Sequence, residues 1–258
     1  MTANGKKTEQ LIIDKMKELG ASLVGIATIE TLKTSPSFEK YSKKPFYEEY
    51  PEDSDDYHKF NGFDWGEEHK SVLVWALSHP ANEPVLDWWS MKVKGFTPGN
   101  GIMRLQSRQM RKWLNEELGI KARSLPYQVE YGGTFLKDSA HLAGIGRIGK
   151  NNLLVTPEYG ARVRLRGMFI EAELEPTGPL SDFDPCNGCP MPCHKACPED
   201  AFRSGSFERK YCKIENDKRY VNEELLDGEI MGIDEPSMVM KPCRFCELAC
   251  PVAQKNSA

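Results

Sequence analysis

The stretch that decides the fold of the last third of this chain is "PCNGCPMPCHKACPED", residues 185–200, which holds four cysteines. A second stretch, "CRFCELACP" at 243–251, holds three more, and Cys212 lies alone between the two. The sequence has eight cysteines in 258 residues, and all of them follow residue 185. This distribution predicts a cysteine-free N-terminal part and a compact C-terminal part built around the thiols.

The spacing of these cysteines favours two [4Fe–4S] clusters, which together require eight thiolate ligands. Each stretch ends in Cys-Pro, and in two-cluster ferredoxins the cysteine before that proline ligates the other cluster. We therefore predict that the two motifs exchange their last cysteines. The first cluster is expected on Cys186, Cys189, Cys193 and Cys250, and the second on Cys197, Cys212, Cys243 and Cys246. Such crossed ligation would couple metal binding to folding.

Two other interpretations of the cysteines remain open. Two zinc knuckles would also use eight thiolates, but a third cysteine follows each Cys-x2-Cys pair here, which favours clusters. Disulfides are rare in a reducing compartment. The first motif also has one residue more than usual between Cys189 and Cys193, and we expect the prolines on both sides of Met191 to absorb it.

The overall composition excludes several classes of partner. Lys and Arg number 34 against 38 Asp and Glu, a net charge of −4, which does not favour nucleic acid or an anionic membrane surface. The N-terminal residues have no apolar core of the kind that a signal peptide needs. No run approaches the roughly 18 apolar residues of a membrane helix. We expect a cytoplasmic protein.

Helical and strand patterns are interleaved before residue 175, which predicts an α/β or α+β fold. Helices are expected at 8–19, 101–119 and 136–144, and strands at 22–28, 71–78, 121–131 and 162–174, the third of these interrupted at Pro126. The stretch 34–70 is expected to be a long surface excursion. A segment rich in Pro, Gly and Asp at 175–185 suggests the boundary between an α+β cofactor-binding domain, 1–178, and a two-[4Fe–4S] ferredoxin-like domain, 179–258.

A glycine-rich segment, "LAGIGRIGKNN" at 142–152, precedes the cysteines. Its Gly-x-Gly-x-x-Gly pattern matches the dinucleotide fingerprint formally, but that fingerprint follows a strand and opens a helix, whereas a helix is expected before this one. The segment and the following strand supply donors for phosphate or amide groups. These donors are Arg147, Lys150, Asn151, Asn152 and Arg162. A tight glycine turn with solvated basic side chains is the alternative.

The glycine segment followed by the two cysteine motifs resembles the epoxyqueuosine reductase family and, more distantly, the reductive dehalogenases. The resemblance extends over about residues 136–251. It implies a nitroreductase-like cobalamin-binding domain followed by a bacterial-type two-cluster ferredoxin domain. It also implies that the glycine segment contacts the cobalamin through Gly144, Gly146, Gly149, Lys150 and Asn151. Arg147 stands where the family has a tryptophan.

The resemblance also suggests where a proton donor would lie. The family has a catalytic aspartate ahead of the glycine motif, and counting back without gaps places Glu130 there. Tyr131 and Asp138 lie in the same range. A carboxyl group buried beside a corrin would have a raised pKa and be a better acid, although carboxylates in loops are usually solvated.

These features support three hypotheses of function. The first is a reductase in which two clusters reduce a bound cobalamin that acts on a small organic substrate. The second is an electron-transfer protein that reduces the corrinoid of a separate partner protein. The third is a flavin-dependent reductase that holds FMN in its N-terminal domain. Each would take electrons from an external donor such as ferredoxin or flavodoxin.

Overall fold

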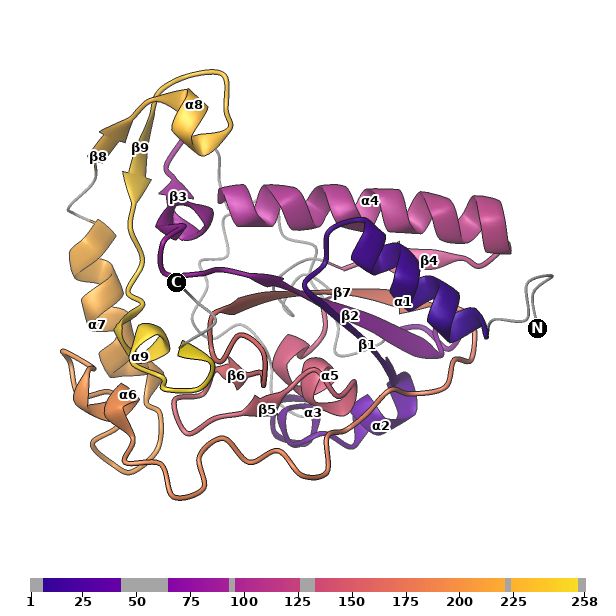
Figure 1. The fold of residues 1–258 in the computed structure, drawn as a ribbon, viewed down its shortest axis with the longest axis horizontal. Coiled ribbons are helices and arrows are strands. Elements are labelled where there is room, and N and C mark those ends of the chain that lie inside the picture. The colour runs from indigo at the N-terminus through magenta and orange to yellow at the C-terminus, as the bar shows by residue number, and fades with distance from the viewer. Residues whose placement is uncertain (1–6, 43–64, 93–95, 126–132, 221–223, 255–258) are drawn as a thin grey trace. The chain divides into compact units, whose positions relative to one another are not determined.

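The computed structural model describes residues 7–42, 65–92, 96–125, 133–220 and 224–254 (Figure 1). The chain forms two compact units, each assembled from separate segments. The first unit comprises residues 1–76, 106–145 and 165–181, and the second comprises 77–105, 146–164 and 182–258.

The first unit is built on a four-stranded sheet in the order β1-β2-β7-β4. Its strands are β1 (Leu23–Thr28), β2 (Ser71–Ser78), β7 (Val163–Ile170) and β4 (Ala122–Ser124). Strand β1 runs antiparallel to β2, and β4 antiparallel to β7. Six consecutive residues of β2, beginning at Ser71, are buried, as expected for a central strand covered on both faces.

Helices cover both faces of this sheet. They are α1 (Thr8–Glu18), α2 (Ile29–Lys33), α3 (Pro36–Tyr41), α4 (Pro98–Leu118) and α5 (Leu136–Leu142). Helices α1 and α4 lie on one side of the strands, and α2 and α5 on the other (Figure 1). The buried indole of Trp75 on β2 donates to Gln106 Oε1 of α4 at 3.0 Å, which links helix and sheet through a satisfied polar contact.

The second unit consists of short elements joined by long connections. The strands are β3 (Trp89–Ser90), β5 (Arg147–Ile148), β6 (Leu154–Val155), β8 (Glu224–Leu226) and β9 (Ser237–Met240). The helices are the 3-10 turn η1 (Pro84–Asp87), α6 (Pro192–Lys195), α7 (Arg209–Tyr220), α8 (Gly228–Met231) and α9 (Phe245–Leu248). Strands β3, β9 and β8 form one sheet, and β5 and β6 form a hairpin.

The secondary structure expected from sequence is confirmed for most elements. The three predicted helices correspond to α1, α4 and α5, and the strands expected at 22–28, 71–78 and 162–174 correspond to β1, β2 and β7. The strand expected at 121–131 is described only as β4, because 126–132 lie outside the described residues. The excursion at 34–70 also packs at its ends. It contributes α3, and the fully buried Trp65 ring lies 5.6 Å from Phe169.

The division into units differs from a single boundary between residues 178 and 179. The chain last passes from the first unit to the second nearby, between residues 181 and 182. However, residues 77–105 and 146–164 also belong to the second unit. Contacts distant in sequence explain why an early segment belongs to the second unit, since β3 pairs with β9 with Trp89 opposite Met240. In the described part of the chain, no helix combines the length and apolar character needed to cross a membrane.

Candidate functional site

The cysteines lie on two similar short motifs in the second unit. Helix α6 carries Cys193 and helix α9 carries Cys246, and the two helices contact each other. Each helix is capped by an alanine, Ala196 or Ala249, that directly precedes the cysteine of a Cys-Pro pair. In each motif the third residue after that cysteine has a positive φ, 45° at Asp200 and 54° at Ala253. The two motifs therefore repeat one backbone pattern.

The extra residue of the first motif has a distinct backbone conformation. Met191 precedes α6 with φ 51° and ψ 56°, in the left-handed region that non-glycine residues seldom occupy. Pro192 then begins the helix at a position where a missing backbone N–H costs nothing. A single left-handed residue thus absorbs the insertion, and it lies between the two prolines, where the sequence places it.

The thiols fall into two groups by their mutual electrostatic effects. Cys250, Cys189 and Cys186 each act to raise the pKa of Cys193. In the other group, Cys243, Cys212 and Cys197 each act to raise the pKa of the Cys246 thiol. These groups have the same members as the two sets that the cysteine spacing predicts. All eight cysteines are free thiols, so this structure contains no disulfide.

Burial is the main cause of the raised pKa values. It raises the pKa of Cys246 to about 12, and it raises those of Cys193, Cys212, Cys243 and Cys250 as well. A metal-free thiol with such a pKa is protonated at neutral pH. Binding of iron would therefore release protons and favour the folded arrangement of the loops.

Backbone and side-chain N–H groups point at several of the sulfurs. Cys186 Sγ accepts from the backbone N–H of Lys150 at 3.3 Å, and Cys197 Sγ accepts from Ala201 at 3.3 Å. Asn216 Nδ2 lies 3.8 Å from Cys212 Sγ. Hydrogen bonds to ligand sulfurs tune the potentials of iron–sulfur clusters, so these donors suit that chemistry. Among the described side chains, no three His, Cys, Asp or Glu gather as closely as a single metal ion requires.

The glycine segment is a β-hairpin, which excludes the dinucleotide fingerprint there. It follows helix α5 and continues into β5 and β6, rather than following a strand and opening a helix. A Cβ at Gly146 would lie 2.3 Å from the backbone oxygen of Val155, and one at Gly149 would lie 2.9 Å from Val155 Cγ2. Gly144, in the first unit, has φ +71° and packs against Gly178. Close contacts within the protein therefore explain why glycine is needed at these positions.

The predicted cofactor-binding side chains of the second unit contact the cysteine loops. Asn151 Nδ2 lies 3.5 Å from the carbonyl oxygen of Cys246, and the buried Arg162 donates to the carbonyl of Val252 at 2.9 Å. Arg147 donates to the carbonyl of Phe183 at 3.1 Å. Asn152 occupies a turn with φ 59°. Asn151, Arg162 and Arg147 thus contact the backbone near the thiols, a role that sequence reasoning did not assign to them.

We expect Gly146→Ala to destabilise the protein whether or not a corrinoid is present. Its methyl group would overlap the Val155 oxygen, and overpacking of this kind costs roughly 1–3 kcal/mol. Urea unfolding with and without added cobalamin measures the change. Gly167→Ala is the matched control, because its nearest contact would be 3.3 Å from the flexible Leu136 side chain. A Gly146→Ala protein of unchanged stability that no longer retains cobalt would contradict this prediction.

The candidates for proton chemistry are only partly described. Glu130 and Tyr131 lie outside the described residues. Asp138, in the first turn of α5, is 6% exposed and accepts a hydrogen bond from Ser37 Oγ at 2.6 Å. Burial lowers the pKa of the neighbouring Lys137 amine. The carboxyl group of Asp138 is thus shielded from solvent and already accepts a hydrogen bond within the first unit.

A buried charge network in the second unit was not predicted from the sequence. Asp87 accepts from His79 Nδ1 and Arg164 Nε, both at 2.7 Å, and pairs with Arg244 at 3.1 Å. Glu247, next to Cys246 in sequence, pairs with the same two arginines. Burial acts to raise the pKa of Asp87, but His79 and the guanidinium groups hold it below its usual range. Burial lowers the pKa of His79, which favours the neutral ring.

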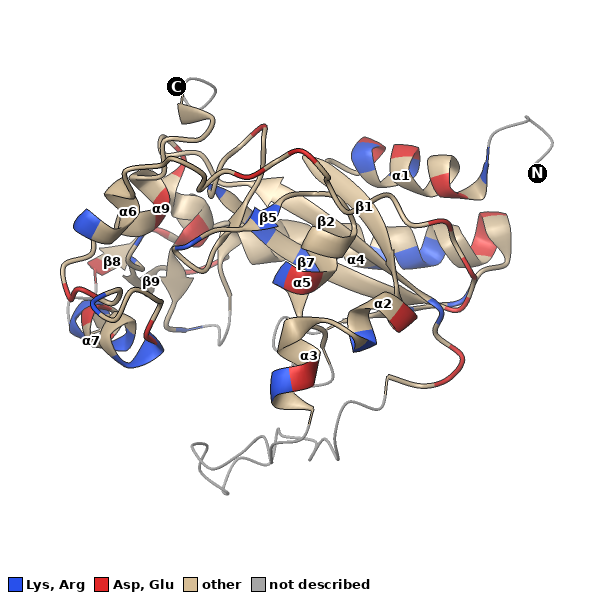
Figure 2. Cartoon of the chain, turned by 90° about the horizontal axis from the view of Figure 1, so that it is seen from below, with Lys and Arg blue, Asp and Glu red and all other residues tan. Residues whose placement is uncertain are grey.

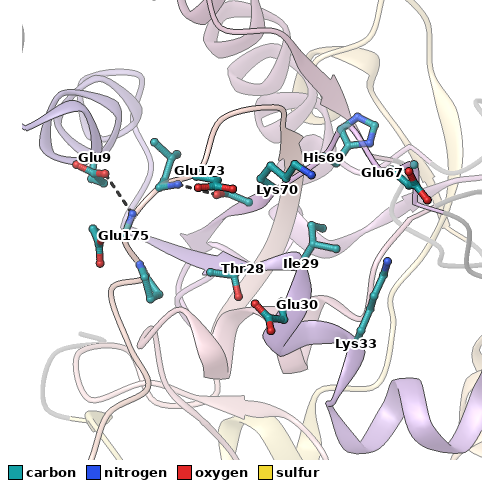
Figure 3. Close-up of a pocket in the computed structure, with 14 residues that line it drawn as sticks. Glu9, Thr28, Ile29, Glu30, Lys33, Glu67, His69, Lys70, Glu173 and Glu175 are labelled. Carbon is teal, nitrogen blue, oxygen red and sulfur yellow. Dashed lines mark hydrogen bonds between the residues drawn. The ribbon is translucent and has the colours of Figure 1, made fainter.

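The first unit has an open pocket of about 860 Å3 beside α2 (Figure 3). Five glutamates line it against two lysines, so its surface carries a net negative charge. The glutamates are Glu9, Glu30, Glu67, Glu173 and Glu175. None of the predicted cofactor-binding or catalytic residues is among the described residues that line it.

Comparison with known proteins finds epoxyqueuosine reductases. No family model matches the chain. An epoxyqueuosine reductase of Listeria monocytogenes is 36% identical over 118 residues, which are 43% of this chain and 28% of that protein. The enzyme of Gloeobacter violaceus is 30% identical over 193 residues, 70% of this chain and 56% of that protein. Over 70% of its length the chain is therefore similar in sequence to an epoxyqueuosine reductase.

Solved structures of other proteins share the fold of this chain. The epoxyqueuosine reductase of Streptococcus thermophilus matches 96% of the chain, and the chain covers 67% of it, with a TM-score of 0.61 at 18% identity. A reductive dehalogenase bound to 3-bromo-4-hydroxybenzoic acid matches the whole chain over 34% of its own length, with a TM-score of 0.57 at 16% identity. At these identities the likeness establishes a common mixed α/β fold.

These matches to epoxyqueuosine reductases confirm the resemblance inferred from the glycine and cysteine motifs. The chain spans 28% to 58% of the length of the first three curated relatives. The activity of those whole proteins is therefore only a proposal for this chain. The nitroreductase-like and ferredoxin-like character of its two parts stays a prediction.

Proposed function

We propose that this chain is an iron–sulfur reductase whose second unit holds two [4Fe–4S] clusters that pass electrons, one at a time, to a corrinoid. The observation that carries the proposal is the grouping of eight free thiols into two sets of four. The relatives are named as reductases, which supports a reductive reaction.

The residues present fit two clusters. Soft thiolates are the preferred ligands of such clusters, and each set supplies the four that one cubane requires. Cys186, Cys189, Cys193 and Cys250 would hold the first cluster, and Cys197, Cys212, Cys243 and Cys246 the second. The N–H donors at Cys186 and Cys197 would stabilise the negative charge that thiolate ligands carry. The clusters, when bound, supply one-electron transfer.

The corrinoid as electron acceptor rests on the resemblance to epoxyqueuosine reductases and reductive dehalogenases. When bound, it would supply the reductive chemistry toward a small organic molecule, and the protein would supply binding and orientation. Close contacts within the protein require glycine at Gly146 and Gly149, and Arg162 donates to the carbonyl oxygen of Val252, so these contacts give no independent support for a corrin. Reduction of a corrinoid on a separate protein, or binding of FMN, are therefore outcomes that the experiment must separate.

Anaerobic purification followed by metal analysis tests the clusters. We expect brown protein with about eight iron atoms per chain, since two [4Fe–4S] clusters contain that number. A colourless protein loaded with zinc would overturn the cluster assignment. The control is the same preparation after iron chelation, which should lose the broad visible absorbance.

Reconstitution of the iron-loaded protein with hydroxocobalamin tests the acceptor. We expect cobalt to co-elute with the protein in gel filtration at about one per chain, as one bound cofactor requires. Parallel reconstitution with FMN is the matched control. Protein that retains iron but neither cobalt nor flavin would leave the clusters in place and overturn the bound corrinoid.

A further inference from the structure

Among the described residues, a buried arginine of the second unit has no carboxylate partner. Arg162 is 3% exposed. Its Nη2 donates to the carbonyl oxygen of Val252 at 2.9 Å, and its Nη1 lies 3.5 Å from the carbonyl oxygen of Cys250. Its Nε is buried and has no hydrogen-bond partner in the described part of the chain. The guanidinium charge therefore faces neutral carbonyl groups rather than an acid.

Many other charged residues of the chain lie beside opposite charges. Acids and bases are adjacent on helices α3 and α7 (Figure 2). In the second unit, Arg164 and Arg244 both pair with Asp87 and with Glu247. A charge removed from water without an opposite charge is strongly unfavourable, and arginines are almost never fully buried unless they are paired. The position of Arg162 therefore indicates an anion other than a carboxylate of the described chain.

The first set of thiols can supply this anion. The carbonyl oxygen of Cys250, a member of that set, faces the guanidinium group of Arg162. Burial raises the pKa of the Cys250 thiol, whereas the N–H of Val252 and the charge of Arg162 act to lower it. The positive charge is thus close enough to act on the sulfur. A cluster held by four thiolates is an anion, and reduction adds one further negative charge to it.

The guanidinium group is fixed in this position by its surroundings. Gly160 has φ 57°, and a Cβ there would lie 2.2 Å from the Val252 oxygen and 3.2 Å from Arg162 Nη2. Glycine therefore lets the segment after Cys250 approach the arginine closely. The backbone oxygen of Arg162 also accepts from the N–H of His79 at 2.9 Å. A fixed, buried charge acts more strongly than an exposed one, because solvent and salt screen it less.

We propose that Arg162 is the counter-ion of the first cluster and raises the reduction potential of that cluster. The inference rests on the proposed function, because it requires the cluster. On reduction, the cluster gains one electron from an external reductant and therefore one negative charge. A buried positive charge stabilises the reduced form more than the oxidised form. The potentials of such clusters depend on the net charge around them, so the loss of this charge has a measurable effect.

A redox titration of the iron-loaded protein, followed by EPR spectroscopy, tests this proposal. Cys186→Ala and Cys243→Ala identify the signal of each cluster. Arg162→Gln removes the charge but keeps an amide donor. We expect the midpoint potential of the first cluster to fall by about 59 mV or more, which is a tenfold change for one electron. A unit charge about 10 Å away has roughly this effect at an effective dielectric constant of about 20. Arg162→Lys should keep most of the wild-type potential.

The matched control is Arg108→Gln, which removes an exposed charge from α4 in the first unit. It should leave both potentials unchanged, because solvent and salt screen an exposed charge. An Arg162→Gln protein with intact clusters and an unchanged first potential would overturn the proposal. An equal shift of both clusters in that variant would do the same.

Iron content keeps the test decisive where Arg162→Gln does not assemble its clusters. If Arg162→Lys then still binds about eight iron atoms, the charge is required, which supports the counter-ion. If both variants lose iron alike, the hydrogen bonds of the guanidinium group matter and its charge does not, which overturns the proposal. Wild type without clusters would overturn the proposed function together with this role of Arg162, whereas intact clusters with an unmoved potential would overturn this role alone.

Discussion

Replacing Cys250 with alanine is expected to abolish the same cluster as replacing Cys186, although the two residues are 64 positions apart. Cys250 belongs by sequence to the second motif, but its thiol interacts with those of Cys186 and Cys189. Because a [4Fe–4S] cluster needs four thiolates, loss of one should remove about four of the expected eight iron atoms. Anaerobic iron analysis and EPR spectroscopy of the dithionite-reduced protein measure the loss.

Matched variants test whether the two motifs exchange their last cysteine ligands. Cys186→Ala and Cys243→Ala identify the EPR signal of each cluster, because each of these residues ligates within its own motif under either arrangement. Under the crossed arrangement, Cys197→Ala should reproduce the Cys243→Ala spectrum. If Cys250→Ala matched Cys243→Ala instead, each motif would hold its own cluster. Should alanine variants lose both clusters, Cys250→Ser keeps a potential oxygen ligand, and its shifted signal identifies the affected cluster.

Much of the architecture could be predicted because its signals are local. The stripe of apolar residues on α4 and the apolar run of β2 are short-range patterns that encode a helix and a buried strand. The membership of the thiol sets follows from the Cys-Pro rule, which is also a local signature. These features required no knowledge of the partners that each element packs against.

The rest could not be predicted because it depends on contacts distant in sequence. Strand β3 joins the second unit through pairing of Trp89 with Met240, and no local periodicity encodes that. The glycine pattern suggested a cofactor contact, yet Gly146 is required by the approach of the Val155 oxygen. Asp87 and Glu247 are single acids separated by 160 residues, and only folding gives them the same two arginine partners.

Replacing Asp87 with alanine is expected to lower the free energy of unfolding by roughly 3–5 kcal/mol, the usual cost of removing one member of a buried ion pair. The Asp87 side chain is 5% exposed, and its loss would leave the His79 ring and two guanidinium groups without their shared acceptor. Urea unfolding of the iron-loaded protein at pH 7 measures the change. Glu116→Ala is the matched control, because Glu116 pairs with Lys112 at 3.9 Å on an exposed face and should cost about 0–1 kcal/mol.

The pH dependence of this difference separates the ion pair from simple loss of packing. The pKa of Asp87 in the folded protein is lowered from its ordinary value of 3.8, so the stability it contributes is fully present above that value. That contribution is lost as the pH falls through the lowered pKa, because the carboxylate must then take up a proton in the folded state as well. The gap between wild type and Asp87→Ala should therefore narrow below about pH 4. A gap that stayed constant into acid would mean that the Asp87 side chain stabilises the second unit by packing alone, and that its charge contributes nothing.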